Sequence, residues 1–380
     1  MFLKELKITN FKNIASLDVG FSKKINCLVG NNGMGKTNIL DAIYALACTK
    51  SKFNTLENLN ITFEQTFCML KGIFQPPQQA DSFAITYSLQ HEKNDENDTP
   101  ITSKRLFYNQ TPYQRLADHI GKIPLVFLVP QDIALINDPE QRRRFMDSSI
   151  AQSDSTYLNA LTNYANLIKQ RNSLLKKMAE NQAVSPELLE AIEQQIIPRA
   201  NYICQQRKLW VESISPIFNR VYFFITNNQE IVQINYKSQL NEMPLEQIFE
   251  EQRQRDIFMG YTTCGVHRDD WEMALGGSSL KKIGSQGQQK TFIISLQLAQ
   301  AFLLQQIVSD NLGVEQKPIL LLDDIFDKLD NSRVKKIIEL LLSENVGQVF
   351  ITHTSSQLLD TFFTAQQADF FHVENGKILA

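Results

Sequence analysis

The stretch GNNGMGKT at residues 30–37 constrains this chain more than any other part of its sequence. It matches the pattern G-x-x-x-x-G-K-[ST] at every fixed position, a pattern that marks a phosphate-binding loop where a strand precedes it and a helix follows. Residues 25–29 are apolar enough for a short buried strand, and residues 38–50 place apolar side chains at helical spacing. The sequence therefore predicts a strand–loop–helix unit and not an ordinary glycine-rich turn.

Such a loop binds phosphate through backbone N–H groups that converge at the N-terminus of a helix. Lys36 can reach the β- and γ-phosphates, and the hydroxyl of Thr37 can ligate Mg²⁺. We therefore expect nucleotide contacts from the loop and the first residues of the helix, namely Gly30, Asn31, Asn32, Gly33, Met34, Gly35, Lys36, Thr37 and Asn38.

The second half of this site is expected near the other end of the chain. Residues 318–322 form an apolar strand that ends in Asp323 and Asp324. Asp323 is expected to hold Mg²⁺ through water, complementing Thr37. Asp324 is then the expected general base that polarises the attacking water; the alternative is a plain acid at the end of a strand.

Four further residues are expected near the nucleotide. Gln131 follows an apolar strand at residues 122–129 and fits a metal- and water-sensing loop. His353 lies at the end of a final strand, where a γ-phosphate sensor would sit; its alternative is a structural role. Lys12 and Asn13 lie in a polar turn between two strands, and they either approach the nucleotide or belong to a solvated turn.

A second anion-binding element is expected at Ser285, Gln286, Gly287 and Gln288, which precede a helix predicted over residues 291–308. A nucleotide site with one phosphate loop needs only one helix N-terminus of its own chain for each γ-phosphate. The sequence therefore suggests a site shared between two protomers, in which this signature closes over the nucleotide of the other copy. Asp330, in a loop at residues 328–330 after the acidic strand, completes this set.

The rest of the chain divides by its periodicity. Residues 51–120 read as a β-rich lobe with strands near 66–74, 82–90 and 104–109 and a polar tip at 91–100. From residue 154 to about 213 the apolar side chains recur at three- and four-residue steps, which predicts an antiparallel helical arm with legs of about 25 residues, or roughly 40 Å. We expect an α/β head formed by residues 1–122 and 255–380, with the arm domain inserted at 123–254.

Net charge and composition bound the function classes. The 380 residues carry a net charge of −3, which argues mildly against nucleic-acid binding, although binding depends on where charge clusters. Basic residues that could meet phosphate are Lys50, Lys52, Arg105, Arg142, Arg143 and Arg144; the arginine triplet has a salt-bridged helix face as its alternative. The five cysteines are scattered and no continuous run of about 18 apolar residues occurs, so we expect a cytoplasmic protein without a membrane span.

The run His267, Arg268, Asp269 and Asp270 invites a metal-site interpretation. If the run is a strand, consecutive side chains point to opposite faces, so all four cannot share one ion. We therefore expect hydrogen-bonding and positioning roles for them.

Together these motifs resemble the ABC-type ATPase heads of the SMC and double-strand-break-repair families, and within that group the RecF family of bacterial recombination mediators. The resemblance spans nearly the whole chain, and it is carried by residues 3–6 with 10–13, the phosphate loop, residues 265–270 and residues 285–290. Two departures occur: Val266 stands where the family usually has proline, and Gln131 stands where an acid is common.

The resemblance implies an SMC-like P-loop ATPase head with a β-rich N-terminal lobe and a short antiparallel helical arm. It implies ATP and Mg²⁺ as cofactors, a homodimer formed with ATP, and slow, DNA-stimulated hydrolysis that reopens the dimer. Its implied partners are double-stranded DNA and single-stranded or gapped junctions, with RecR and RecO as proteins that help to load RecA. The alternative is an SMC-like ATPase of a defence or chromosome-maintenance system.

Overall fold

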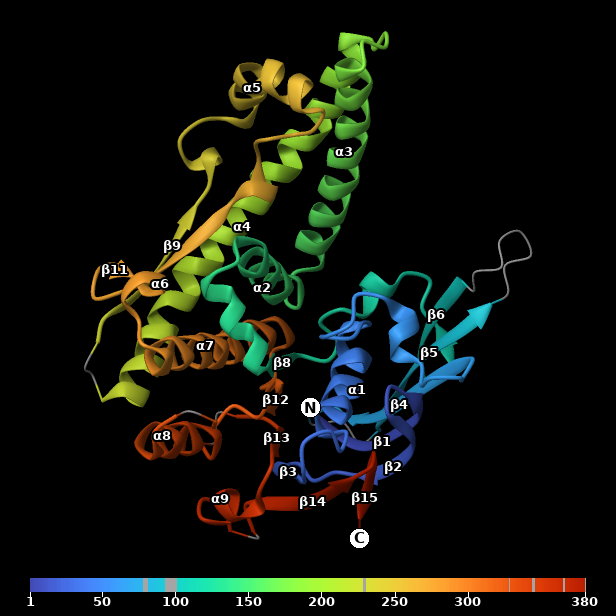
Figure 1. The fold of residues 1–380 in the computed structure, drawn as a ribbon, viewed down its shortest axis with the longest axis vertical. Coiled ribbons are helices and arrows are strands. Elements are labelled where there is room, and N and C mark those ends of the chain that lie inside the picture. Colours follow the sequence, from blue (N-terminus) through green and yellow to red (C-terminus); the bar gives the residue numbers. More distant parts are fainter. Residues whose placement is uncertain are drawn as a thin grey trace. The chain divides into compact units, whose positions relative to one another are not determined.

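The fold comes from a computed structural model that describes residues 1–77, 81–92, 101–227, 230–327, 329–343, 346–364 and 366–379. Most of the expected tip at residues 91–100, and Lys328 of the expected loop at 328–330, lie outside these described residues. The chain forms two compact units (Figure 1). Unit 1 consists of Met1–Asp132 and Ile294–Ala380, and unit 2 of Ile133–Ile293.

A mostly parallel sheet of six strands carries the phosphate loop in unit 1. The strands run in the order β15-β14-β3-β13-β12-β8, and only the β14–β15 pair is antiparallel. Their bounds are β3 (Ile25–Val29), β8 (Leu125–Leu128), β12 (Ile319–Asp323), β13 (Val349–His353), β14 (Ala368–Glu374) and β15 (Lys377–Leu379). Strands β3 and β12 are fully buried, which explains why their sequences are continuous apolar runs and not alternating ones.

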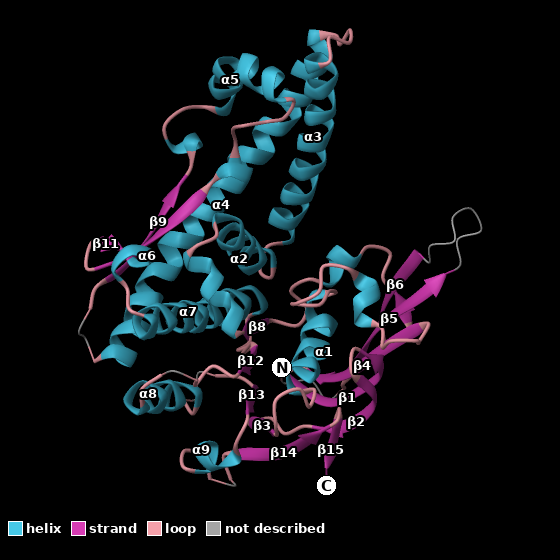
Figure 2. Ribbon diagram, in the orientation of Figure 1, coloured by secondary structure: helices cyan, strands magenta, loops and turns pink. Residues whose placement is uncertain are grey.

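The β-rich lobe of unit 1 is a second, antiparallel sheet with strand order β2-β1-β4-β5-β6-β7 (Figure 2). Its strands are β1 (Phe2–Phe11), β2 (Ile14–Gly20), β4 (Phe67–Gln75), β5 (Phe83–Glu92), β6 (Ile101–Tyr108) and β7 (Thr111–Pro112). Burial alternates along β4 and β5, as expected for a sheet with one face on the core. The expected strands are confirmed, with shifts of a few residues at their ends.

Helix α1 (Lys36–Cys48) packs against strands of both sheets of unit 1. Its residues Leu40, Ile43 and Leu46 are fully buried and belong to one apolar core with side chains from β1, β4, β5, β8, β12 and β13. The helix that follows the phosphate loop is therefore held on two sides, and this fixes the loop at its N-terminus. Unit 1 also contains α8 (Asn331–Leu341), α9 (Ser356–Asp360) and the 3₁₀ helices η1 (Glu57–Asn60) and η2 (Leu116–His119).

Unit 2 contains the helical arm (Figure 1). Its helices are α2 (Pro139–Ala151), α3 (Ser155–Ala179), α4 (Pro186–Thr226) and α5 (Leu245–Met259). Helices α3 and α4 pack together after a short connection, and α5 packs against both. The antiparallel arm is confirmed, but α4 has 41 residues, continues through Pro198 and Pro216, and is about 60 Å long instead of the expected 40 Å.

The remaining strands of unit 2 are β9 (Val232–Lys237), β10 (Asp270–Leu275) and β11 (Ser278–Ser279), in the order β11-β10-β9. Shorter elements are η3 (Pro130–Ile136), which begins in unit 1, η4 (Gln239–Asn241), η5 (Val266–Arg268) and α6 (Leu280–Ile283). Helix α7 (Gln286–Leu312) starts in unit 2 and ends in unit 1.

This division differs from the expected domain boundaries of 123 and 254. Residues 123–132 belong to unit 1 because β8 pairs with β12 in the parallel sheet. Residues 255–293 belong to unit 2 because β10 pairs with β9, so the signature element at Ser285 lies in the same unit as the arm.

Residues 286–311 of α7 are long and apolar enough to cross a membrane by length and composition alone. In the apolar 18-residue stretch of this helix, 78% of the residues are buried inside the protein, as in the core helix of a folded domain. Polar residues such as Ser295 and Gln297 interrupt the sequence, which is why it contains no continuous apolar run.

Gln348, just before β13, joins the two sheets of unit 1. Its side-chain oxygen accepts a hydrogen bond from the backbone N–H of Leu3 at 2.7 Å, and its amide donates to the carbonyls of Leu3 at 2.9 Å and Ser22 at 2.6 Å. The side chain is 1% exposed, so these backbone groups have no ready access to water. The side-chain amide of Gln348 thus provides hydrogen-bond partners for the N–H and the carbonyl of Leu3 in β1.

Replacing Gln348 by leucine should lower the free energy of unfolding by about 3 kcal/mol, because it leaves buried backbone groups without partners. Urea unfolding of the variant and the wild type would measure this loss. The matched control is Gln366→Leu, at an exposed residue, which should change the stability by less than about 0.5 kcal/mol. Equal effects of the two substitutions would contradict the assigned role of Gln348.

Candidate nucleotide-binding site

A pocket of about 220 Å³ lies where the parallel strands β3, β8, β12 and β13 end. The C-terminal edge of a parallel sheet is the usual place for a nucleotide in open α/β folds. Its lining consists of Asn13, Asn32, Gly33, Gly35, Lys36, Thr37, Asn38, Pro130, Asp323, Asp324, Thr352 and Thr354. The structure thus brings together the two ends of the chain that the sequence assigned to one site.

The shape of the phosphate loop depends on glycine at two positions. Gly30 has a φ of +150°, and a Cβ atom there would lie 2.3 Å from the carbonyl oxygen of Val373 on β14. Gly35, at the N-cap of α1, has a φ of +101°, in the region that side chains disfavour. From the far side the β14–β15 turn supports the loop, since the N–H of Gly376 donates to the carbonyl of Met34 at 2.8 Å.

Lys36 is 8% exposed and lies inside the loop. Its ammonium group donates to the carbonyl oxygens of Gly30 at 2.6 Å and Asn31 at 2.8 Å. Burial lowers the pKa of Lys36, while the nearby carboxylates of Asp324 and Asp323 act in the opposite direction. The carbonyls of the loop therefore hold the ammonium group of Lys36 at the pocket, where a phosphate group would contact it.

Asp323 and Thr37 form the expected pair for a magnesium ion. The hydroxyl of Thr37 lies 2.8 Å and 3.0 Å from the two carboxylate oxygens of Asp323. Burial raises the pKa of Asp323, and the hydrogen bonds that it accepts from Thr352 and Thr37 oppose that shift by favouring the carboxylate. A hydroxyl and a carboxylate at this separation fit the oxygen ligands that Mg²⁺ prefers.

Thr352 is a residue of the site that the sequence analysis missed. Its hydroxyl donates to Asp323 at 2.7 Å and accepts a hydrogen bond from the N–H of Asp324 at 3.0 Å. Asp324 has a φ of +46°, a left-handed conformation that is uncommon for residues other than glycine. Thr352 thus orients the carboxylate of Asp323 and holds the backbone of Asp324, and the signal in the sequence was the pair of threonines that flank His353.

Asn13 and Lys12 are neighbours in the sequence but have different surroundings. Asn13 lines the pocket, donates to the carbonyl of Gly33 at 3.3 Å, and accepts from the amide of Asn38 at 2.7 Å. Lys12 instead forms an ion pair at 2.6 Å with Asp41 of α1, whose side chain is fully buried. Only Asn13 of this pair contacts the phosphate loop, and Lys12 is committed to the core.

Gln131 and His353 are not among the residues that line the pocket. Gln131 is exposed at the start of η3, and its neighbour Pro130 lines the pocket in its place. The ring of His353 contacts the backbone of Ser355, with Nδ1 at 2.8 Å from the carbonyl oxygen and 3.1 Å from the N–H. In this conformation neither Gln131 nor His353 contacts the carboxylates of Asp323 and Asp324.

Helix α7 begins at Gln286, so Gln286, Gly287 and Gln288 form its first turn and do not precede it, contrary to the sequence expectation. Ser285 lies immediately before the helix, as expected. Ser285 and Gln288 form reciprocal hydrogen bonds: the N–H of Ser285 donates to the side chain of Gln288 at 2.8 Å, and the N–H of Gln288 donates to the hydroxyl of Ser285 at 3.3 Å. This is a capping box, a device that defines a helix N-terminus. Gln286 and Gly287 occupy the first turn between them, in unit 2, whereas the phosphate loop is in unit 1.

Asp330 caps α8. Its carboxylate accepts from the N–H of Arg333 at 3.0 Å and from the hydroxyl of Ser332 at 2.6 Å. The hydrogen bond from Ser332 is the main cause of the lowered pKa of Asp330. In this structure its carboxylate therefore has a structural function within its own chain.

The candidate phosphate-contacting residues fall into two groups. Arg142 is removed from the candidates, because it is 8% exposed and its guanidinium group binds Asp270 and the carbonyls of Leu135 and Ile136. Lys52 pairs with Asp132 at 2.9 Å. The exposed members of the set are Lys50, Arg105 and Arg144, with Arg105 and Arg144 each near a glutamate. Arg143 is half-buried and donates to the carbonyl of Asp269 at 2.8 Å.

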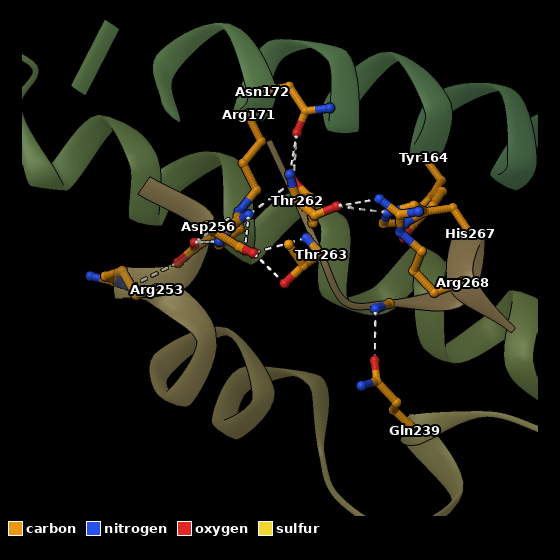
Figure 3. Close-up of polar contacts among 12 residues, drawn as sticks. Tyr164, Arg171, Asn172, Gln239, Arg253, Asp256, Thr262, Thr263, His267 and Arg268 are labelled. Atoms are coloured by element: carbon orange, nitrogen blue, oxygen red, sulfur yellow. Dashed lines mark hydrogen bonds and ion pairs between the residues drawn. The ribbon is translucent and has the colours of Figure 1, made fainter. Parts of the chain in front are cut away.

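The run from His267 to Asp270 is a 3₁₀ turn followed by the start of β10, and not the expected continuous strand. Figure 3 shows His267 and Arg268 beside Tyr164 and Thr262. Nδ1 of His267 lies 2.7 Å from the hydroxyl of Tyr164, and its Nε2 lies 3.3 Å from the carbonyl of Thr262. Asp269 pairs with Arg207 at 2.8 Å and Asp270 pairs with Arg142 at 2.6 Å. These contacts support the expected positioning roles.

A buried arginine holds the loop before this run. Arg171 of α3 is fully buried and pairs with Glu193 of α4 at 2.8 Å and with Asp256 of α5 at 2.7 Å. Its guanidinium group also donates to the hydroxyl of Thr262 at 2.9 Å (Figure 3). Three helices of the arm thus meet at one charged side chain, each partner of which is needed to offset the cost of burying it.

Asn13→Ala should lower the affinity for ATP about fivefold, because it removes neutral hydrogen bonds to the phosphate loop. The control is the adjacent Lys12→Ala, which should leave the ATP affinity within about twofold but lower the melting temperature, since Asp41 then loses its buried counter-ion. Fluorescent ATP titration and thermal unfolding measure the two effects. An unchanged affinity in Asn13→Ala would argue against its place in the site.

His267 should make unit 2 sensitive to acid. Burial lowers its pKa to about 4, and the neighbouring Arg268 and Arg143 act in the same direction. Since the unfolded histidine titrates near pH ~6.5, the unfolded state binds more protons between pH ~6.5 and ~4. Stability is fully present above pH ~6.5 and falls by up to about 3 kcal/mol as the pH approaches ~4. Urea unfolding across this range should show a smaller loss for His267→Gln.

The matched control for that experiment is His372→Gln, at an exposed residue of β14 in unit 1. It should keep the acid sensitivity of the wild type. If His267→Gln loses as much stability in acid as the wild type does, the acid sensitivity has another source.

Comparisons with known proteins agree with this geometry. The RecF/RecN/SMC N terminal domain family matches residues 2–378. A DNA replication and repair protein RecF from Porphyromonas gingivalis is 41% identical over 382 aligned residues, which cover 100% of both chains. The RecF protein of Bacteroides fragilis is 38% identical over 381 aligned residues, which cover 100% of this chain and 98% of that protein.

Solved structures show the same likeness. A structure of the recombination mediator protein RecF-ATP in the RecFOR pathway matches with a TM-score of 0.83 and 26% identity, covering 100% of this chain and 98% of that one. The Smc head domain of Pyrococcus furiosus shares the fold at a TM-score of 0.56 and 17% identity, covering 100% of this chain and 96% of its own. The chain therefore belongs to the RecF family, within the RecF/RecN/SMC N terminal domain family of ABC-type ATPase heads.

Proposed function

We propose that this protein is an ATP-dependent DNA clamp of replication and recombinational repair, which acts in the cytoplasm with RecO and RecR to load RecA onto single-stranded DNA. The observation that carries the proposal is the pocket in which Lys36, Thr37 and Asp323 converge, in a chain that matches RecF proteins over its full length. The pocket supports binding and hydrolysis of ATP, and the match to RecF proteins supports a role in DNA repair.

ATP binding follows from the geometry of the loop. The backbone N–H groups at the start of α1 receive the phosphate oxygens, and Lys36 contributes the positive charge. Asn13 and Asn38 close one side of the pocket through their mutual hydrogen bond. Thr37 and Asp323 hold Mg²⁺, which neutralises charge that develops on the transferred phosphoryl group.

Slow hydrolysis resets the clamp. Asp324, whose N–H is held by Thr352, orients a water molecule and accepts its proton. Gln131 and His353 reach the site when nucleotide is bound, the former as a metal- and water-sensing residue and the latter as a γ-phosphate sensor. Hydrolysis is weak and is stimulated by DNA, so the ATPase acts as a switch.

The active form is a homodimer with two composite sites. Ser285, Gln286, Gly287 and Gln288 of one copy close over the ATP bound by the other, and Asp330 completes the contact. The support is the capping box at Ser285 and Gln288, which leaves the N-terminus of a 27-residue helix facing the solvent at an exposed serine.

DNA binds to the closed dimer through phosphate contacts, which are salt-sensitive and independent of sequence. Lys50, Lys52, Arg105, Arg143 and Arg144 are the candidate contacts within the described residues, with Lys52 available only when it leaves Asp132. Gapped duplexes and junctions are the proposed substrates, since they combine double-stranded and single-stranded DNA.

Light scattering measures the mass of the protein with no nucleotide, with ADP and with ATP. We expect a monomer without ATP and a dimer with it. Lys36→Arg should weaken the response through poorer ATP binding, Ser285→Arg should abolish the dimer while ATP still binds, and Asp324→Asn should hold the dimer closed by slowing hydrolysis. A gapped duplex added last should bind best under dimer conditions and lose affinity steeply as salt is raised.

If the mass never responds to ATP while hydrolysis continues at a normal rate, the shared site is wrong and the protein is a self-contained nucleotidase. If the dimer forms but gapped DNA binds equally well without ATP, the clamp is wrong and the shared site stands.

A further inference from the structure

A chain of side-chain hydrogen bonds connects helix α4 of the arm to the signature. Tyr222, near the C-terminal end of α4, donates its hydroxyl proton to one carboxylate oxygen of Glu230. The other carboxylate oxygen of Glu230 accepts from the side-chain amide of Gln288. Gln288 in turn accepts from the N–H of Ser285 at 2.8 Å, so the order is Tyr222, Glu230, Gln288, Ser285.

Glu230 fixes the orientation of the Gln288 amide. The N–H of Ser285 can only donate, so the oxygen of the amide must point toward it. A carboxylate can only accept, so the NH₂ group must point toward Glu230. With a donor on one side and an acceptor on the other, the amide has one favourable orientation, and the capping box gains a partner outside its own helix.

This arrangement also determines what the hydroxyl of Ser285 can do. The hydroxyl oxygen accepts from the N–H of Gln288 at 3.3 Å, which leaves its proton available for a further acceptor. Ser285 is exposed, so that acceptor can come from outside the chain. A phosphate oxygen, which accepts and cannot donate when ionised, is the matching group.

Beneath the polar chain an apolar contact holds the same two helices together. Phe218 and Tyr222 of α4 and Phe292 of α7 are all fully buried. The rings of Phe218 and Phe292 have centroids 4.7 Å apart in an edge-to-face arrangement, and those of Tyr222 and Phe292 are 6.2 Å apart. These ring contacts pack the first turns of α7 against α4. Glu230 then determines the orientation of one side chain, the capping residue Gln288.

We propose that Glu230 and Tyr222 are positioning residues that hold Gln288, and through it Ser285, in the orientation that receives the γ-phosphate of ATP bound by a second copy of this chain. The inference rests on the proposed function for the shared site. It adds residues outside every motif of the nucleotide site, and it makes the arm helix α4 part of the machinery that closes the dimer.

Variants of Glu230 separate the hydrogen bond from the charge. Glu230→Ala removes the acceptor and frees the amide of Gln288. Glu230→Gln can keep both contacts, since its oxygen accepts from Gln288 and its amide donates to the hydroxyl of Tyr222, which rotates. Tyr222→Phe removes one link only and keeps the buried ring. Glu272→Ala, at an exposed residue that pairs with Lys237 in the same unit, is the matched control.

Two measurements are made on the full chain. The first is the ATP concentration needed for half-maximal dimerisation, followed by light scattering, with the affinity of the monomer for a fluorescent ATP analogue measured in parallel. The second is amide hydrogen exchange at residues 285–289 of the protein without nucleotide, which reports the order of the signature whether or not a dimer forms.

For Glu230→Ala we expect about a tenfold rise in the ATP concentration for dimerisation, the effect of losing the hydrogen bond that orients Gln288, with the monomer affinity for ATP unchanged. Exchange at residues 285–289 should be about tenfold faster. Tyr222→Phe should show smaller changes in the same direction, and Glu230→Gln and Glu272→Ala should stay within about twofold of the wild type.

If Glu230→Ala dimerises and exchanges like the wild type, the inference is wrong while the proposed function stands. If Glu230→Gln is as defective as Glu230→Ala, the charge and not the hydrogen bond acts, and the inference is also wrong. If the wild type never dimerises with ATP, the proposed function fails. In that case faster exchange in Glu230→Ala shows only that the capping box depends on Glu230, and the phosphate-receiving part of the inference is overturned.

Discussion

The carboxylate of Asp323 is the contact on which the nucleotide site depends. It accepts hydrogen bonds from Thr37 at the start of α1 and from Thr352 on β13, so segments from both ends of the chain meet at one side chain. Burial of this carboxylate is unfavourable by itself, and the hydroxyl donors offset that cost. The same donors place the carboxylate where a metal ion would need it, so the stability of the site and its chemistry have one physical origin.

Unit 2 uses buried charge in a different way. Arg171 and Arg207 are almost fully buried, and each is surrounded by carboxylates and hydroxyls from several elements. Buried ion pairs add little net stability when compared with apolar packing, but removing one partner is costly. We infer that these arginines specify how α3, α4, α5 and the loop before β10 fit together, because any shift in register would leave a charge unpaired.

The sequence predicted the elements that carry strong local patterns. The phosphate loop, the acidic strand, the alternating lobe and the helical arm all depend on short-range periodicity or on a fixed motif, and the structure confirms them. The head fold was predicted through the resemblance that these motifs carry, and the comparisons confirm it.

What the sequence did not reveal depends on contacts between distant residues. Lys12 was expected at the nucleotide, but its partner Asp41 is an acid on the next helix, and periodicity gives no sign of that pairing. Thr352 and Glu230 lie outside any motif, and their importance comes only from what they touch. Arg142 was a candidate because its neighbours are basic, yet Asp270, far along the chain, accepts its hydrogen bonds.

The order of strands in the parallel sheet has a consequence for synthesis. Strand β3 is central, and both of its neighbours, β13 and β14, come from the last part of the chain. The phosphate loop also leans on Gly376, so it gains its full support only when a segment about 340 residues downstream has emerged. At the usual rate of translation this takes about twenty to seventy seconds. Throughout that time the two edges of β3 lack their native partners, and an unpaired apolar strand is a site at which a nascent chain can aggregate.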